Sequence, residues 1–145
     1  MKKVVLLLAC SWFCLGQISG QSFFQFYFYG NGVRHDALMS IENDDNIDVW
    51  VKYYDSDLGR YVVVHQDASA VSGQGGVAIL CENPVYDGTN RSAYYNADNF
   101  FIINRGYGNY ELYNIDDDNA YSKVYGLKEL KTKADLVRAY VQFAN

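Results

Sequence analysis

The sequence predicts a mainly β protein, in which repeated short strands joined by turns or single helical turns form one compact domain. Short apolar runs recur behind a small residue followed by a polar one, as at Ser56-Asp57 and Ala97-Asp98. A recurring strand-sized unit indicates similar pieces that pair or stack. Aromatic residues make up 17% of the chain, with 14 Tyr, and Tyr favours half-buried sheet positions. Because there is only one Pro, Gly, Asn and Asp must form most turns.

The composition is that of a folded protein with an export signal. The chain has 145 residues, of which 50% are hydrophobic and 20% charged, which predicts one domain with a packed core. Residues 1–20 have the pattern of a secretory signal peptide, because Lys2 and Lys3 precede an apolar stretch that ends in small residues. An uncleaved anchor, a buried N-terminal strand and lipidation at Cys10 are the alternatives. We expect a domain over residues 21–145, secreted or held in the periplasm or cell envelope, with no membrane span after cleavage.

Removal of the signal peptide changes the charge and the cysteine count. The full chain has 12 basic and 17 acidic residues, and loss of Lys2 and Lys3 takes its net charge from −5 to −7. Such an acidic protein is not expected to bind nucleic acid, because nonspecific binding requires basic side chains against phosphates. Cys81 then remains as a single cysteine in an apolar run. This predicts a buried thiol and no internal disulfide.

Alternating apolar residues and intervening turn residues predict the individual strands. The predicted strands cover residues 22–29, 38–41, 48–54, 60–65, 77–81, 100–103, 110–115 and 123–125. Residues 69–76 are rich in Ser and Gly, and we expect them to form a flexible loop.

The C-terminal segment is compatible with two structures. Apolar residues between 127 and 144 recur at helical spacing, and Thr132 and Asp135 have the spacing of a capping interaction. This pattern predicts an α+β fold with a C-terminal helix over about residues 127–144. Alternate residues over 137–143 are also apolar, as in a strand. The repeat favours this second structure, with a short helical turn over residues 127–133 followed by a strand.

The repeat is clearest between Tyr110 and Asn145, which looks like three tandem units. Its closest matches to a unit of the form Ala-Asp-x-x-Val-Tyr begin at Ala120 and at Ala134. On these units, residues 47–145 resemble short bacterial proteins of unknown function that repeat the unit about every dozen residues. The resemblance implies a mainly β repeat domain, and it implies no catalytic residues.

Acidic turns are the candidate metal sites. Ca²⁺ requires several oxygen ligands at once, and Asp55 with Asp57 and Asp116 with Asp118 place carboxylates at alternate positions. The first pair lacks the later Glu and Gly of an EF-hand loop, and solvated turns are the competing interpretation. Ca²⁺ is therefore the one cofactor that the sequence suggests.

Aromatic side chains are the candidate ligand-binding residues. Trp50, Tyr53, Tyr61 and Tyr95 would form a binding surface for a glycan or a peptide if they share one face of a sheet. Core and cross-strand packing is the competing interpretation. In addition, Asn90 lies in an N-glycosylation sequon.

No complete phosphate-loop, zinc-protease or nucleophile-elbow motif is present in the sequence. We therefore predict a non-enzymatic binding or structural module of the envelope or extracellular space, whose partner is a glycan or an envelope protein. One alternative is a small secreted hydrolase that uses His65 with a nearby Asp, although His35 and His65 both lie in polar surroundings typical of exposed histidines. Another is self-assembly through an exposed edge strand at residues 23–29.

Overall fold

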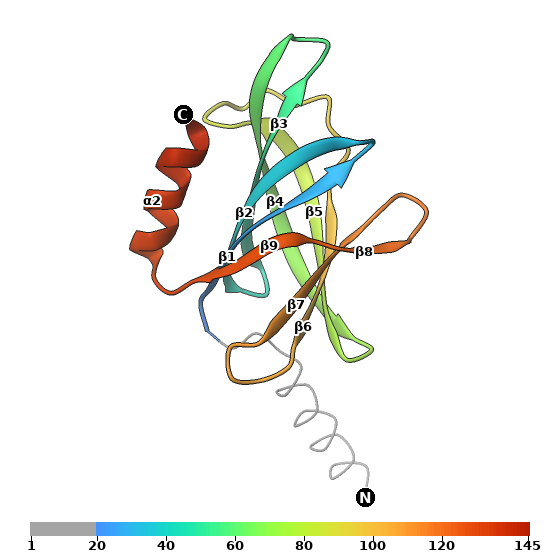
Figure 1. Ribbon diagram of the computed structural model, residues 1–145, viewed down its shortest axis with the longest axis vertical. Coiled ribbons are helices and arrows are strands. Elements are labelled where there is room, and N and C mark those ends of the chain that lie inside the picture. Colours follow the sequence, from blue (N-terminus) through green and yellow to red (C-terminus); the bar gives the residue numbers. More distant parts are fainter. Residues whose placement is uncertain (1–19) are drawn as a thin grey trace, which may run out of the picture.

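The computed structural model describes residues 20–145, which form a mainly β domain followed by a helix (Figure 1). The strands are β1 (Ser22–Gly30), β2 (Val33–Asn43), β3 (Asn46–Asp55), β4 (Arg60–Gly73), β5 (Gly76–Tyr86), β6 (Asn99–Asn104), β7 (Tyr110–Ile115), β8 (Tyr121–Lys123) and β9 (Tyr125–Leu130). The helix α2 (Lys133–Ala144) ends the chain. The predicted fold class is confirmed, whereas the predicted signal peptide lies, but for its last residue, outside the described residues.

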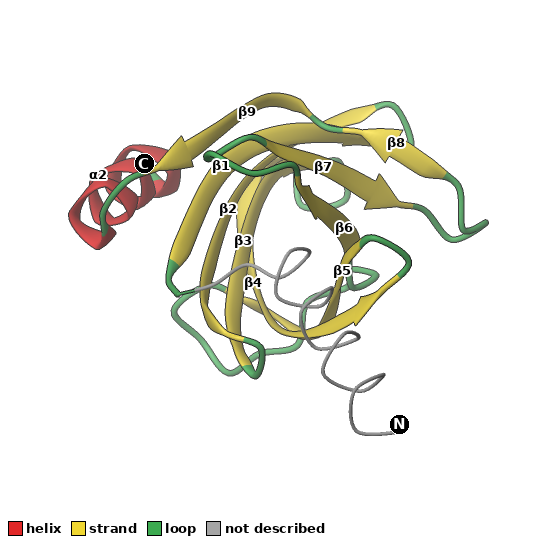
Figure 2. Cartoon of the chain, turned by 90° about the horizontal axis from the view of Figure 1, so that it is seen from below, coloured by secondary structure: helices red, strands yellow, loops and turns green. Residues whose placement is uncertain are grey.

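The strands form one antiparallel sheet that curls into a nearly closed barrel. Each strand from β1 to β7 pairs with the next along the chain, and β9 returns to pair with β1, so β8 and β9 are the two end strands of the sheet. Only Val124 separates β8 from β9, and its backbone N–H donates to the Leu112 carbonyl of β7 at 3.1 Å. The segment from β8 to β9 therefore passes from β7 to β1 and nearly closes a barrel (Figure 2). The prediction of an exposed edge at residues 23–29 is wrong, because β1 is paired on both sides.

A hydrophobic cluster fills the interior of this barrel. Phe24, Phe26 and Phe28 alternate along β1 and all belong to the cluster. The rings of Phe26 and Phe28 meet the edge of Phe100 on β6 at centroid distances of 5.4 and 5.6 Å, a favourable arrangement for aromatic pairs. Cys81 lies in the same cluster as a free buried thiol, as predicted. Burial raises the pKa of this thiol well above its usual value, so it stays protonated.

Strand residues and one two-residue turn replace the flexible loop expected over residues 69–76. Strand β4 continues to Gly73 and β5 begins at Gly76, so only Gln74 and Gly75 form the turn. Both turn residues have positive φ, 48° and 81°, as in the two-residue hairpin turns that match strand twist. The expectation is wrong because pairing with β5, rather than local composition, determines whether such a segment is a strand.

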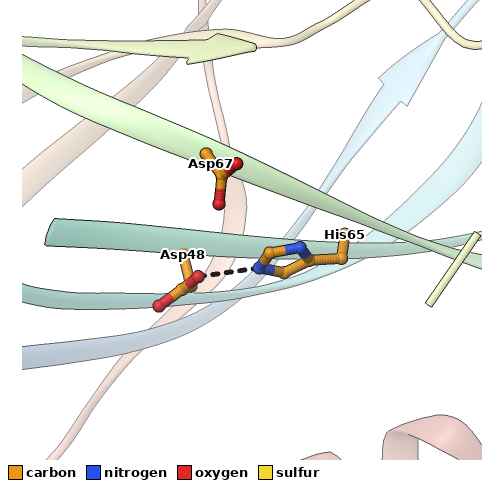
Figure 3. Close-up of side chains that lie close together, drawn as sticks. All are labelled: Asp48, His65 and Asp67. Carbon is orange, nitrogen blue, oxygen red and sulfur yellow. Dashed lines mark hydrogen bonds and ion pairs between the residues drawn. The ribbon is translucent and has the colours of Figure 1, made fainter. Parts of the chain in front are cut away.

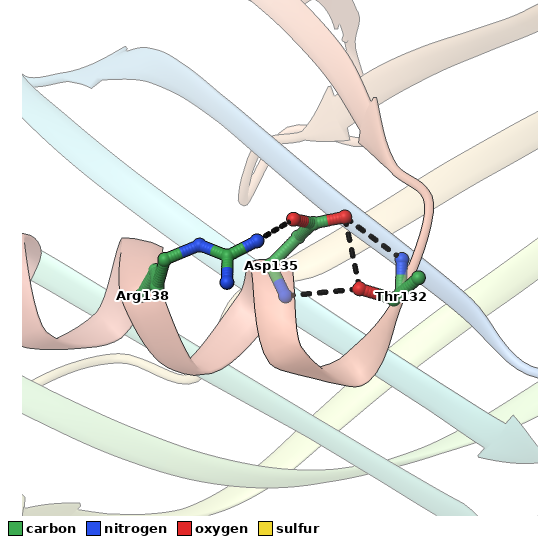
Figure 4. Close-up of polar contacts among 3 residues, drawn as sticks. All are labelled: Thr132, Asp135 and Arg138. Atoms are coloured by element: carbon green, nitrogen blue, oxygen red, sulfur yellow. Dashed lines mark hydrogen bonds and ion pairs between the residues drawn. The ribbon is translucent and has the colours of Figure 1, made fainter.

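The C-terminal segment forms a strand and then a helix, which is the reverse of the order that the repeat predicted. Residues 125–130 form the strand and residues 133–144 form the helix, so the expected helical turn followed by a strand is wrong. Thr132 caps the helix: its hydroxyl accepts from the Asp135 backbone N–H at 3.1 Å, and the Asp135 carboxylate accepts from the Thr132 N–H at 3.2 Å (Figure 4). This capping box satisfies the backbone N–H groups of Thr132 and Asp135 at the start of the helix. In a strand, these groups would need partners on a neighbouring strand.

Helix α2 packs against the outside of the barrel, beside β9 and β1 (Figure 2). Its buried residues are Leu136, Ala139 and Phe143, which contact Phe23 and Leu38 on the outer face of the sheet. The spacing of these three residues is helical, so one side of the helix becomes apolar. The alternation over residues 137–143 was compatible with a strand, but two of its apolar residues, Val137 and Val141, are exposed on the helix.

Candidate functional site

The alternation of side chains sorts the four predicted ligand-binding residues onto two faces of the barrel wall. Tyr53 is buried in the interior cluster, and Tyr95 packs against that cluster. Trp50 lies on the outer face, where its ring is 5.8 Å from that of Tyr140 on α2. Tyr61 is also on the outer face and is 64% exposed. The four residues therefore do not form one binding surface.

The predicted calcium-binding residues form hydrogen bonds within their own turns. The Asp55 side chain accepts from the Asp57 backbone N–H at 2.9 Å, in the turn between β3 and β4. The Asp116 side chain accepts from the Asp118 N–H at 3.0 Å, in the turn between β7 and β8. Such contacts stabilise turns without a metal. Calcium binding at these turns stays a prediction.

A groove of about 400 Å³ lies between the C-terminal half of α2 and the outer face of the sheet. The sheet contributes Gln25, Asp36, Lys52 and Tyr61 from four successive strands, and the helix contributes residues 139, 142 and 143. The groove therefore has a polar floor and one largely apolar wall.

Strand register brings the charged and aromatic groups of this groove together. Asp36 and Lys52 are direct partners on β2 and β3. The Lys52 ammonium lies 5.6 Å from the centre of the Tyr61 ring, and Tyr61 meets Tyr54 edge to face at 5.4 Å. Arg34 donates to Asp36 at 2.9 Å. A carboxylate, an ammonium group and an exposed ring thus share one surface.

Further tyrosines extend this surface across β1 to β9. Tyr27 stacks on Tyr125 at 5.4 Å, and Tyr29 meets the edge of Tyr125 at 5.7 Å. We call these three residues the tyrosine platform. It adjoins the groove, because Tyr27 pairs with the groove residue Asp36. Sequence reasoning missed the platform, although the alternation of Phe and Tyr over residues 23–29 was a signal: Phe24, Phe26 and Phe28 face inward, so Tyr27 and Tyr29 face outward.

A polar cluster lies inside the barrel. One carboxylate oxygen of Asp98 accepts from the Gln66 side-chain amide and from the Tyr95 hydroxyl, both at 2.8 Å. Gln66 also accepts from the Asp98 backbone N–H at 2.8 Å and is fully buried. Burial raises the pKa of Asp98 to about 6, and the two donated hydrogen bonds lower it in part. The whole Asp98 residue is only half-buried, but its carboxylate is held by the buried amide.

His35 belongs to the same interior, so the prediction of an exposed histidine is wrong. Its ring stacks on Phe28 at 5.1 Å and on Tyr53 at 5.0 Å, and its Nδ1 lies 2.8 Å from the Val33 carbonyl oxygen. Burial lowers the pKa of His35 from its usual value. Side chains along β2 point alternately into and out of the barrel, and His35 is at an inward position. This alternation, rather than the polar neighbours of His35 in the sequence, determines its burial.

His65 lies on the outer face, 24% exposed, with its Nε2 2.7 Å from an oxygen of Asp48. Asp67 completes a cluster whose ligand atoms lie within 4.8 Å of one another (Figure 3). His65 thus meets an Asp, as the hydrolase alternative expects, but the barrel wall separates it from His35. His65 is also absent from the residues that line the groove.

Comparison with known proteins adds no family assignment, since the chain matches no family model, no curated protein and no solved structure. Within residues 20–145, no helix is long and apolar enough to cross a membrane. Fold alone does not define function, so we infer function from the side chains of the groove.

Proposed function

We propose that this protein is an exported, non-enzymatic binding module whose ligand is a neutral glycan held in the groove between α2 and the sheet. The observation that carries the proposal is the grouping of Asp36, Lys52 and Tyr61 in this groove. An exposed aromatic ring presents an apolar face to the C–H groups of a sugar. The carboxylate and the ammonium group accept from and donate to sugar hydroxyls.

The amides of the groove suit the same ligand. Gln25 lines it from the sheet and Gln142 from the helix, and each amide carries both donors and an acceptor. Sugar hydroxyls also donate and accept, so amides on both sides match them. Because the floor consists of paired strands and the wall is a capped helix, binding requires little ordering of the protein.

The charge of the protein favours a neutral glycan over an acidic one. The chain has a formal net charge of −5, and Asp36 lies within the groove. An acidic protein repels polyanionic ligands over a distance of about a Debye length, roughly 8–10 Å. The tyrosine platform beside the groove supports a ligand longer than one sugar ring, because it adds exposed aromatic faces along β1 and β9.

The test is binding of neutral oligosaccharides to the full chain, first on a glycan array and then by titration calorimetry. We expect Tyr61→Ala to lower the affinity about tenfold, which corresponds to about 1.4 kcal/mol, and Asp36→Asn to lower it as well. Tyr94→Ala is the matched control, because Tyr94 is 99% exposed and lies outside the groove. Absence of glycan binding, or equal losses for Tyr61→Ala and Tyr94→Ala, would refute the proposal and leave an envelope protein as the competing partner.

A further inference from the structure

We propose that Asp48, His65 and Asp67 form a binding site for a divalent transition-metal ion of the Zn²⁺ class on the outer face of β3 and β4. The three side chains offer two carboxylate oxygens and one imidazole nitrogen within 4.8 Å of one another. These are ligand types that Zn²⁺ uses in proteins. The site shares no residue with the glycan groove and does not depend on that proposal.

Strand register creates a charge conflict that a cation would resolve. Asp48 and Asp67 are direct partners across β3 and β4, and like charges at directly opposed positions destabilise a strand pair. Within residues 20–145, the one ion pair that involves either carboxylate is that of Asp48 with His65, which is charged only when protonated. A divalent ion between the two carboxylates neutralises both.

The geometry requires only small side-chain movements. Nε2 of His65 lies 2.7 Å from Oδ1 of Asp48, within hydrogen-bond distance (Figure 3). Ligand atoms about 2.1 Å from a tetrahedral Zn²⁺ lie roughly 3.4 Å apart, so the ion replaces this hydrogen bond as the two side chains separate slightly. The backbone positions are constrained, because β3 also pairs with β2 and β4 with β5.

The cluster is open enough to complete a coordination shell with water. The side chain of Asp48 is 34% exposed and that of His65 is 24% exposed, and Asp67 is exposed. Three protein ligands with a solvent position are typical of open zinc sites. Ca²⁺ fits poorly, because it takes six to eight oxygen ligands and the cluster offers two carboxylates and a nitrogen.

Trp50 supplies a local optical signal. Its ring centre lies 5.4 Å from that of His65, so a paramagnetic ion such as Cu²⁺ bound to His65 should quench its fluorescence. The chain has two Trp residues, and Trp12→Phe leaves Trp50 as the sole tryptophan. Cys10→Ser and Cys14→Ser in the same full-length chain remove two thiols that would otherwise compete for the metal.

The test is titration of this full-length variant, stripped of metal with a chelator, with ZnCl₂ by calorimetry and with CuCl₂ by fluorescence. We expect one Zn²⁺ per chain, quenching of Trp50 by Cu²⁺, a higher melting temperature in excess Zn²⁺, and a Zn²⁺ affinity that added CaCl₂ does not lower. His65→Ala and the near-isosteric Asp67→Asn should each lower the Zn²⁺ affinity at least about tenfold.

Asp57→Asn is the matched control, because it removes an exposed carboxylate from the turn between the same two strands without touching the cluster. Its Zn²⁺ affinity should equal that of the parent. No saturable Zn²⁺ binding by the parent, or binding that Asp67→Asn and His65→Ala leave unchanged, overturns the proposal. Melting curves of each variant establish that a loss of binding is not a loss of folding.

Discussion

Asp98→Asn tests whether the interior of the barrel holds a carboxylate that is costly to ionise. Gln66 and Tyr95 both donate to the same oxygen of Asp98. An Asn side chain with its carbonyl oxygen in that position accepts both hydrogen bonds, so the substitution removes the charge and preserves the contacts. The difference in stability between the two proteins therefore reports the ionisation of Asp98.

The expected magnitude follows from the raised pKa of Asp98, about 6 against an ordinary value of 3.8. A difference of about two pKa units corresponds to about 3 kcal/mol. Because the pKa is higher in the folded state, that state binds more protons between pH 4 and 6, so the free energy of unfolding falls as the pH rises through this interval. Relative to the wild type, Asp98→Asn should thus gain about 3 kcal/mol between pH 4 and pH 7.5.

Urea unfolding at intervals from pH 4 to 7.5 measures this difference. His35, whose pKa is lowered by burial, adds a slope of opposite sign below about pH 6.5, but both proteins share it and it cancels in the comparison. The control Asp57→Asn removes an exposed carboxylate and should show no comparable gain in stability between pH 4 and pH 7.5. A stability difference between Asp98→Asn and wild type that is the same at every pH would show that the reasoning about burial is incorrect.

Two further substitutions test barrel packing and the helix cap, each by urea unfolding at pH 7. Gly76→Ala should destabilise the protein by about 1–3 kcal/mol, because the added Cβ would lie 2.5 Å from the Phe101 ring. The control is Gly73→Ala, whose added Cβ would have no atom within 4 Å. Similar losses of stability at both positions would contradict this packing. Thr132→Ala should cost about 1 kcal/mol through loss of the capping box, and an unchanged stability would mean that the cap contributes nothing.

Much of the fold could be predicted because strand signals are local. The alternation over residues 48–54 lies within β3, and the strand predicted over residues 110–115 coincides with β7. The misassigned segments show the limit of such signals. Residues 69–73 form a strand because they pair with β5. Asp98, one half of a repeated small–polar pair, is a half-buried hydrogen-bond acceptor for Gln66 rather than a turn residue.

The candidate sites were predictable only in part. His65 with a nearby Asp was expected, but neither Asp48 nor Asp67 was identified as its neighbour, because they lie on strands whose register the sequence does not state. Tyr61 was expected at a binding surface and lines the groove. Its neighbours Asp36 and Gln25 come from other strands, and no spacing along the chain connects them.

By itself, the sequence determined most of the strand-forming segments, the capping signal at Thr132 and the burial of Cys81, because these depend mainly on residue type and on neighbours a few positions away. Only the tertiary structure decided the closure of the barrel through β9, the groove under α2 and the separation of His35 from His65. These features depend on strand register and on the face to which each side chain points. A shift of one residue exchanges the two faces of a strand, so register, rather than composition, decides which residues meet.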